Sequence, residues 1–231
     1  MLILLTGASR GIGFEMVKHF AAVPGTLVIA VSRNIAPLQK LVKSGIHTIL
    51  PLKADITRTS DLKKIAKTVK RLEMPLDILI NNAGEIINKP FTSITAEEIS
   101  SVYNTNVFAP FHLIQELIPF MKSSQAAHVV NISSMGGVTG TAKFPGLSAY
   151  SSSKGALTIL SECLAEELKT TSIKVNCLAL GAVQTEMLSL AFPGYKAPLE
   201  AHNMAGYICD FAVNGRKFFN GKVIPVSSST P

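Results

Sequence analysis

Residues 2–13 of the chain read LILLTGASRGIG, an apolar run followed by a glycine-rich turn. The run predicts a buried strand that feeds the turn and then a helix. Gly7, Gly11 and Gly13 would permit a tight turn, close approach of the backbone to a pyrophosphate, and close packing of helix on strand. Because the spacing differs from G-x-G-x-x-G, a simple connection remains an alternative to a nucleotide site. Placement directly after the first strand favours the nucleotide site.

Short apolar runs alternate with helical patterns along the rest of the chain, which indicates parallel strands joined by helices. We expect strands at 2–6, 26–32, 47–52, 77–81, 128–133, 174–180 and 222–226. Thr95 and Glu98 form a capping box that predicts a long helix ending near Lys122, and 60–72 has the pattern of an amphipathic helix. The predicted fold is α/β, a doubly wound parallel sheet of seven strands (Rossmann-like) with helices on both faces. Ligands of such sheets bind beyond the carboxyl ends of the strands.

The composition favours one globular domain over residues 1–231, since 47% of the residues are hydrophobic and only 16% are charged. The apolar segment 107–121 is interrupted by polar residues and prolines, so we expect a buried or interface helix and no membrane span. No signal peptide pattern is expected at the start. The three scattered cysteines indicate reduced thiols in a cytoplasmic protein, and the scattered histidines indicate no metal site.

The net charge of +7 could suggest a nucleic acid partner. No basic run exceeds two adjacent residues, however, and aromatic residues make up 6% of the chain. We therefore expect a solvated basic surface and no nucleic acid binding. Part of the excess charge could attract a phosphate-bearing cofactor or an acidic carrier protein.

Tyr150 and Lys154 are four residues apart, so a helix would place them on one face. A fixed positive charge near a phenol favours the phenolate and lowers its pKa from roughly 10. The tyrosine could then transfer a proton to a carbonyl oxygen near neutral pH. By itself the pair leaves a second interpretation open, an exposed lysine one turn below a packed tyrosine.

Four separated motifs together resemble the short-chain dehydrogenase/reductase family, and they occur in the family's order. They are 6–13, Asn81-Asn82-Ala83-Gly84 after an apolar strand, Asn131-Ile132-Ser133-Ser134, and Tyr150 with Lys154. The resemblance runs from residue 2 to about 226. Within the family the chain is similar to the NADPH-dependent reductases, including the 3-oxoacyl-carrier-protein reductases.

The resemblance implies catalytic roles for four residues. Tyr150 would donate a proton to the substrate carbonyl while hydride passes from the nicotinamide, and Lys154 would hold the nicotinamide ribose and lower the tyrosine pKa. Ser134, in preference to Ser133, would hydrogen-bond the substrate oxygen. Asn106, with Asn104 as the neighbouring alternative, would support a water chain that resupplies the proton. Serine and asparagine also serve as ordinary hydrogen-bonding residues of turns and helices.

The end of the second strand predicts the cofactor, since an NAD enzyme would place an acidic residue there. The chain instead has Ser32 and Arg33, which can bind a 2′-phosphate, and Arg10 would add a second positive group. Asp55 resembles the acid that meets the adenine amino group, or it is a turn residue. The expected contacts to NADPH (or NADP) are Gly7, Ser9, Arg10, Gly11, Ile12, Gly13, Ser32, Arg33, Asp55, Ile56, Asn82, Ala83, Gly84, Tyr150, Lys154, Gly181, Val183 and Thr185.

Three features depart from the family pattern. The loop 136–143 lengthens the separation of Ser134 and Tyr150, Leu180 replaces a proline before Gly181, and the substrate lid, at about 186–202, is short. The pocket is then open, or a second subunit completes it. Apolar residues of the lid and of the loop before Tyr150 favour an apolar or acyl-chain ketone, unless they are simple core packing. These residues are Phe144, Leu147, Met187, Leu188, Leu190, Phe192 and Tyr195.

The sequence thus predicts an oxidoreductase that transfers hydride from NADPH to a ketone or 3-oxoacyl carbonyl, with Tyr150 as general acid. The alternative is a nucleotide-sensing or regulatory protein with little turnover. The helices 95–122 and 148–169 carry apolar residues on more than one side, among them Phe108, Leu157 and Leu160. By resemblance, these helices pair across a twofold axis in a homodimer or homotetramer.

Overall fold

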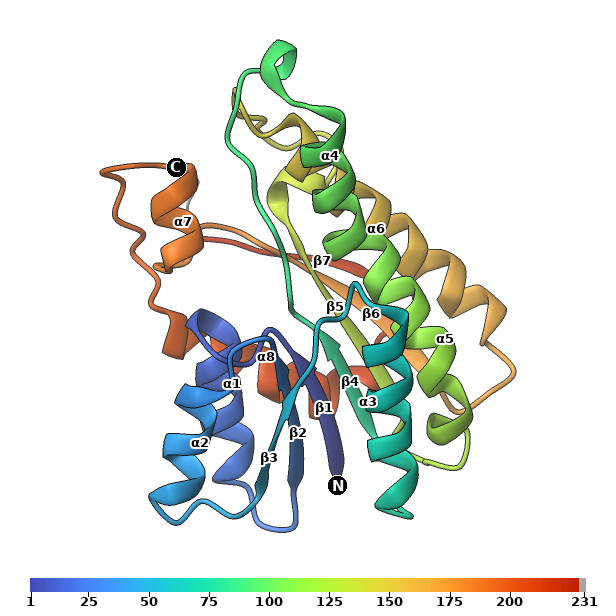
Figure 1. Cartoon of the computed structure of the whole chain (residues 1–231). Coiled ribbons are helices and arrows are strands. Elements are labelled where there is room, and N and C mark those ends of the chain that lie inside the picture. Colours follow the sequence, from blue (N-terminus) through green and yellow to red (C-terminus); the bar gives the residue numbers. More distant parts are fainter. Residues whose placement is uncertain (229–231) are drawn as a thin grey trace.

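The computed structural model describes residues 1–228, so the last three residues of the predicted domain, 229–231, lie outside the described residues. Its centre is one parallel sheet in the order β3-β2-β1-β4-β5-β6-β7 (Figure 1). The strands are β1 (Leu2–Thr6), β2 (Leu27–Ser32), β3 (Ile49–Lys53), β4 (Ile78–Asn81), β5 (His128–Ser134), β6 (Lys174–Leu180) and β7 (Val223–Val226). The predicted doubly wound, seven-stranded fold is confirmed, with strand ends that differ by one or two residues.

Helices cover both faces of the sheet (Figure 1). The larger ones are α1 (Gly11–Ala21), α2 (Ala36–Lys43), α3 (Thr59–Arg71), α5 (Ala109–Met121), α6 (Ser148–Glu167) and α8 (Ala201–Asn214). Residues from α1, α2 and α8 pack into one core, and residues from α3, α5 and α6 pack into the other. The shorter elements are α4 (Ala96–Tyr103), α7 (Glu186–Ala191), the 3₁₀ turns η1 (Phe91–Ser93), η3 (Met135–Gly137) and η4 (Gly215–Lys217), and the π turn η2 (Asn104–Phe108).

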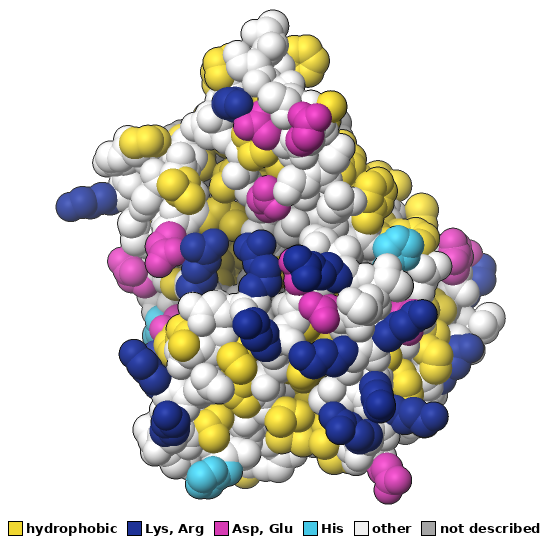
Figure 2. All heavy atoms as spheres, in the orientation of Figure 1, with side chains coloured by type: hydrophobic (Ala, Val, Ile, Leu, Met, Phe, Trp, Pro, Cys, Tyr) yellow, Lys and Arg dark blue, Asp and Glu magenta, His cyan; other side chains and the backbone are white. Residues whose placement is uncertain are grey.

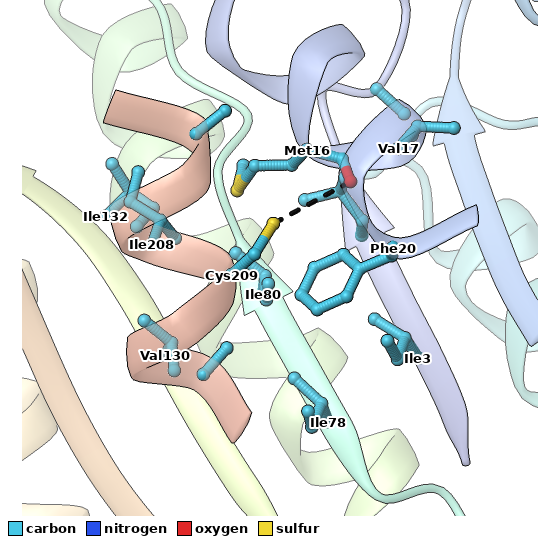
Figure 3. Close-up of a cluster of buried hydrophobic side chains, with 14 of the residues drawn as sticks. Ile3, Met16, Val17, Phe20, Ile78, Ile80, Val130, Ile132, Ile208 and Cys209 are labelled. Atoms are coloured by element: carbon cyan, nitrogen blue, oxygen red, sulfur yellow. Dashed lines mark hydrogen bonds between the residues drawn. The ribbon is translucent and has the colours of Figure 1, made fainter. Parts of the chain in front are cut away.

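Strand β1 explains why the sheet has two cores. Its five residues are all buried, and successive side chains point to opposite faces. Ile3 and Leu5 therefore belong to the core beneath α1 and α8, whereas Leu2 and Leu4 belong to the core beneath α3 and α5. Figure 3 shows the first core, in which Phe20 of α1 lies between the sheet and α8.

The predicted helix from 95 to 122 is present as one helical run from α4 to α5, but its regular α geometry is interrupted in the middle. Its capping box is confirmed, because Thr95 accepts from the Glu98 amide and Glu98 accepts from the Thr95 amide. After α4, however, the chain takes the π turn η2 before α5 begins. Pro110 lacks the amide hydrogen that an α-helix would give to the carbonyl of Asn106, four residues earlier, which favours a departure from regular α geometry at this point.

The sheet has its topological switch point between β1 and β4. From β1 the chain proceeds outward to β2 and β3, and then returns to β4 on the other side of β1. A crevice at the carboxyl ends of the strands is expected at this place. Among the described residues, no helix is long and apolar enough to cross a membrane.

Candidate active site

A cavity of about 690 Å³ opens at the carboxyl ends of the strands, over the β1/β4 switch point. Its lining residues come from separate segments of the chain. The first of these is the glycine turn after β1, and the last includes the short helix α7. Every residue predicted to contact the cofactor lines this one cavity, and so does Ser134. Asn106 lies behind the wall and is fully buried. The predicted residues that line the cavity come from seven separate segments of the sequence and meet at the place where doubly wound sheets bind ligands.

The glycine turn after β1 has the geometry that a phosphate site requires. Gly7 and Gly11 adopt positive φ angles of 67° and 52°, which disfavour side chains. A Cβ atom on Gly13 would lie 2.1 Å from the carbonyl oxygen of Gly7, so only glycine lets α1 approach the strand this closely. The first turn of α1 carries no acidic side chain and no side-chain cap. Its free amides are therefore available to an anion.

Thr6 joins the glycine turn to the loop after β4. Its Oγ1 accepts hydrogen bonds of 3.1 Å from the amides of Asn82 and Ala83, and the Asn82 side chain donates to the Thr6 carbonyl at 3.0 Å. Hydrogen bonds thus join two of the sequence motifs, 6–13 and 81–84, across the switch point between β1 and β4. The sequence did not single out Thr6 for this role, because a threonine at a strand end gives no signal of its partner.

Ser32 and Arg33 lie at the end of β2, as predicted. Ser32 donates a hydrogen bond of 2.8 Å to the hydroxyl of Ser9, and the Arg33 side chain is exposed at the cavity. Burial acts to raise the pKa of Asp55, but hydrogen bonds from Thr57 and the charges of Arg33 and Arg58 lower it below its ordinary value. The Asp55 carboxylate thus serves a turn, which was the alternative interpretation, while it also faces the cavity.

Arg10 lies on the rim but is directed toward the lid. Its guanidinium forms an exposed ion pair of 2.8 Å with Glu186, the first residue of α7. Thr185, the residue before Glu186, caps α7: its hydroxyl accepts a hydrogen bond of 3.2 Å from the Leu188 amide. The short lid is therefore tied directly to the glycine turn, and a contact of Arg10 with a 2′-phosphate stays a prediction.

Tyr150 and Lys154 lie in the first two turns of α6. The Lys154 Nζ atom is 5.9 Å from the centroid of the Tyr150 ring and donates a hydrogen bond of 2.8 Å to the carbonyl oxygen of Ile132. Burial lowers the pKa of Lys154 to about 8. Burial also raises the pKa of Tyr150, and a hydrogen bond with Ser134 only partly offsets this. The predicted lowering of the tyrosine pKa is thus wrong for this structure, because desolvation raises this pKa more than Ser134 lowers it.

Ser133 and Ser134 are separated by the pleat of β5. Ser133 is buried and donates to the backbone carbonyl of Lys154 at 2.9 Å. Ser134 faces the cavity, as does Tyr150, whose pKa the Ser134 hydroxyl acts to lower. The structure therefore brings the predicted serine, and not its neighbour, to the tyrosine. The longer loop that follows packs on α6, where a Cβ on Gly137 would lie 2.6 Å from the backbone of Lys154.

Asn106 connects α6 to the loop after β4. Its side chain accepts from the Glu85 amide at 2.8 Å and donates at 2.9 Å to the Glu85 carbonyl and to the Ser153 hydroxyl. Ser153 in turn donates to the carbonyl oxygen of Tyr150 at 2.7 Å. Asn104, the alternative, is exposed. Asn106 therefore links the backbone of Glu85 to Ser153 of α6, and it does not line the cavity.

An apolar wall forms the remaining end of the cavity. Phe144 meets Phe192 edge to face with 5.0 Å between ring centroids, and Asn88 donates to the Ala191 carbonyl at 2.7 Å, which holds the lid against the body. The lining side chains are Ile86, Ala142, Phe144, Leu147, Met187, Leu188, Ala191 and Phe192. Leu190 and Tyr195, which we expected here, do not line the cavity, and Leu190 is 68% exposed.

The net positive charge is concentrated on one part of the surface. Residues 33–73 contain ten of the 22 Lys and Arg but only three of the 15 Asp and Glu, so this segment alone carries +7. The remaining residues contain 12 of each sign and are neutral in sum. Figure 2 shows Lys and Arg side chains gathered over α3 and across the middle of this face. The charge thus lies beside the end of the cavity formed by Ser32, Arg33 and Asp55.

This arrangement defines an enzyme of the dinucleotide-binding α/β class, because its cavity occupies the crevice where such sheets hold their cofactors. The family model for short chain dehydrogenases matches residues 1–195. The chain therefore belongs to the short-chain dehydrogenase/reductase family of oxidoreductases, as the sequence motifs predicted.

Individual relatives agree with this assignment. The chain is 34% identical over 189 residues to the ketoacyl reductase HetN of Nostoc sp., covering 80% of this chain and 64% of that protein. It is 33% identical over 201 residues to a tropinone reductase homolog of Arabidopsis thaliana, covering 85% of this chain and 73% of that protein. The match thus spans just under two thirds of the Nostoc protein and more of the plant protein.

Solved structures show the same fold over nearly the whole chain. A 3-ketoacyl-(acyl-carrier-protein) reductase from Brucella melitensis, complexed with NADH, superposes with a TM-score of 0.86 at 25% identity, covering 97% of this chain and 96% of that chain. A 4-hydroxyisoleucine dehydrogenase complexed with NADH superposes with a TM-score of 0.87 at 23% identity, covering 99% and 97%. The second likeness is a likeness of fold alone.

Proposed function

We propose that the protein is an NADPH-dependent carbonyl reductase that acts on a ketone or a 3-oxoacyl carbonyl, with Tyr150 as the general acid. The observation that carries the proposal is that Tyr150 and Ser134 both line the cavity that all predicted cofactor residues line, with Ser134 placed so that it acts to lower the pKa of Tyr150. The hydroxyl groups of Tyr150 and Ser134 lie at the largely apolar end of the cavity. Both can donate a hydrogen bond to the same carbonyl oxygen of a substrate.

The residues of the cavity fit a dinucleotide. The space around Gly7 and Gly13, which a Cβ atom would fill, and the free amides of α1 suit a pyrophosphate. Support for the phosphorylated form comes from Ser32 and Arg33 in place of a carboxylate, and from the basic segment beside them. The two solved relatives described above were complexed with NADH, so cofactor preference is the part of the proposal that most needs measurement.

In this proposal, each residue of the site has a separate role in the reduction. The Ser134 hydroxyl fixes the substrate oxygen, and the Tyr150 hydroxyl donates its proton to that oxygen as the alcohol forms. When bound, NADPH supplies the hydride. Lys154 would exchange its bond to Ile132 for the ribose hydroxyls, which would keep its charge near the phenol and oppose the rise in the tyrosine pKa. Asn106 and Ser153 hold the backbone of Tyr150 from behind.

The wall of Phe144, Leu147, Met187 and Phe192 supports an apolar substrate, such as an acyl chain or an alicyclic ketone. The experiment is NADPH oxidation measured over a panel of ketones and 3-oxoacyl thioesters, with Tyr150→Phe as control. Turnover that depends on Tyr150 supports a reductase. NADPH binding without turnover on any member of the panel would instead support the alternative, a nucleotide-sensing protein of the same fold.

We also propose that the protein assembles as a homodimer or homotetramer. The outer surface of η2, α5 and α6 exposes Phe108, Phe111 and Ile159, by 50%, 40% and 59%. An apolar surface of this kind is suited to a second copy of the chain. Leu157, which we expected on that surface, is buried in its own subunit, and Leu160 is half-buried. A cytoplasmic location is proposed because the thiols of Cys177 and Cys209 are buried and unpaired.

A further inference from the structure

A carboxylate with no assigned role lies beside the candidate site. Glu85 follows Gly84, which lines the cavity, and its side chain reaches the helical segment 101–105. The Ser101 hydroxyl donates to its two carboxylate oxygens at 2.9 and 3.0 Å, and the Thr105 hydroxyl donates to one of them at 3.0 Å. Thr105 lines the cavity as well. Glu85 therefore connects one wall of the cavity to the π turn η2.

The backbone of the same residue is held by the next residue of that turn. Asn106 accepts from the Glu85 amide and donates to the Glu85 carbonyl. The side chain of Glu85 thus accepts hydrogen bonds from Ser101 of α4 and Thr105 of η2, while Asn106 of η2 holds the backbone of Glu85. The contacts form a closed ring between the loop after β4 and η2, so neither segment can shift without breaking several hydrogen bonds.

The chemistry of the ring favours a carboxylate in particular. An ionised carboxylate offers only acceptors, and both of its partners here are hydroxyl donors. Among residues 1–228, no ion pair involves Glu85, so the two hydroxyls are its charge-stabilising partners. An amide would turn an NH₂ group toward one of these hydroxyls, and an apolar side chain would leave both hydroxyls without this acceptor.

The ring leads to Tyr150 by a short path. Asn106 donates to Ser153, and Ser153 donates to the Tyr150 carbonyl oxygen. A π turn departs from the regular helical ladder and needs other contacts to fix it. We propose that Glu85 is a positioning residue: by holding Ser101 and Thr105 it fixes η2, so that Asn106 supports the first turn of α6 beneath Tyr150. This inference rests on the proposed function, and it does not place Glu85 in contact with the substrate or the cofactor.

The test compares Glu85→Ala and Glu85→Gln with a matched control in the same region. Glu98→Gln is that control, because Glu98 also accepts hydrogen bonds at α4 but belongs to its amino-terminal cap. For each variant we would measure kcat and KM for the carbonyl substrate, the NADPH dissociation constant, and hydrogen exchange of the amides in 104–109. Thr105→Val alone and combined with Glu85→Ala completes the set.

We expect Glu85→Ala to lower kcat about tenfold, which corresponds to one strong positioning contact, to leave the NADPH dissociation constant within about twofold, and to accelerate exchange in 104–109. Glu85→Gln should retain part of the activity, and Glu98→Gln should keep kcat. Because the Thr105 hydroxyl acts on the ring through its bond to Glu85, its removal after Glu85→Ala breaks no further contact of the ring, and the double variant should lose no more activity than Glu85→Ala.

Wild-type kcat in Glu85→Ala would overturn the proposal, even if the exchange were faster, because Glu85 would then be merely structural. Additive losses in the double variant would overturn it too. The failure of the proposed function is separate: a wild-type protein that reduces no carbonyl removes the reductase, and with it any positioning role of Glu85. The exchange in 104–109 would still report whether Glu85 holds the turn.

Discussion

The ammonium group of Lys154 donates to the carbonyl oxygen of Ile132 at 2.8 Å, while the ring of Tyr150 lies 5.9 Å away on the same helix. The lysine is thus held by the backbone of β5 and not by the phenol. Because it is buried, its pKa falls to about 8. A ligand that moves the Lys154 ammonium group toward Tyr150 would change both the pKa of the phenol and the charge inside the cavity.

Removal of the phenol should separate chemistry from binding. Tyr150→Phe keeps the ring but loses the proton donor, so we expect carbonyl reduction to be abolished and the NADPH dissociation constant to change little. Lys154→Ala should damage both, since it removes the proposed ribose contact and the positive charge. Steady-state turnover and calorimetric titration check the two effects. A folded Tyr150→Phe protein with substantial turnover would remove the proposed mechanism.

Cofactor preference should depend on Ser32. We expect NADPH to bind at least about tenfold tighter than NADH, the effect of roughly one charge-assisted hydrogen bond. Ser32→Asp should reverse the preference, because a carboxylate repels the 2′-phosphate and accepts from ribose hydroxyls. Calorimetry with both cofactors measures this, and equal dissociation constants in the wild type would reject the prediction.

The basic segment should accelerate the capture of NADPH. Lys63, Lys67 and Lys70 of α3 are exposed and do not line the cavity, so their replacement by Gln should change the association rate more than the dissociation rate. The difference should vanish in about 1 M salt, where the screening length falls to about 3 Å. Stopped-flow fluorescence provides both rates. The matched control replaces three lysines outside residues 33–73, Lys122, Lys169 and Lys174, by Gln. If this control slowed NADPH association equally, the effect would not be specific to the basic segment.

Stability should fall in mild acid because of His128. Burial lowers the pKa of this histidine to about 4, and it is held by the Ala212 carbonyl and Asn176. The unfolded chain binds the proton at its ordinary pKa of 6.5, so stability is unaffected above that value and is lost progressively as the pH falls toward 4. Between pH 7 and pH 5 the loss is about 2 kcal/mol. Urea denaturation of the wild type and of His128→Gln at both pH values should show it, and the same decline in the variant would assign the effect elsewhere.

Assembly should depend on the outer surface of η2, α5 and α6. We expect Phe108→Glu or Ile159→Glu to shift a micromolar homo-oligomer toward monomer, since a charge on a buried apolar contact is strongly unfavourable. Phe91→Glu is the control. Phe91 is also exposed, by 79%, but it belongs to η1 and not to η2, α5 or α6. Light scattering distinguishes the states. An active wild-type monomer would contradict the claim.

The sheet could be predicted from sequence because each strand is a compact apolar run with a turn signal after it. The π turn η2 was not predicted although Pro110 is visible in the sequence, since the turn also depends on partners of Asn106 that are distant in the chain. Ser134 could be chosen over Ser133 only by resemblance, and the pleat of β5 supplies the physical reason. The Tyr150 pKa and the exposure of Leu190 were missed because burial is a property of the folded chain.

The central place of β1 also has a consequence for biosynthesis. Ile3 of this strand pairs with Val28 on one side and with Ile78 on the other. During translation the strand must therefore wait for β4, some 75 residues later, before both of its edges are paired. Until then a strand of four apolar residues and Thr6 presents an open edge, which is a template for association with other chains. The nascent chain is therefore most exposed to aggregation before β4 has been synthesised.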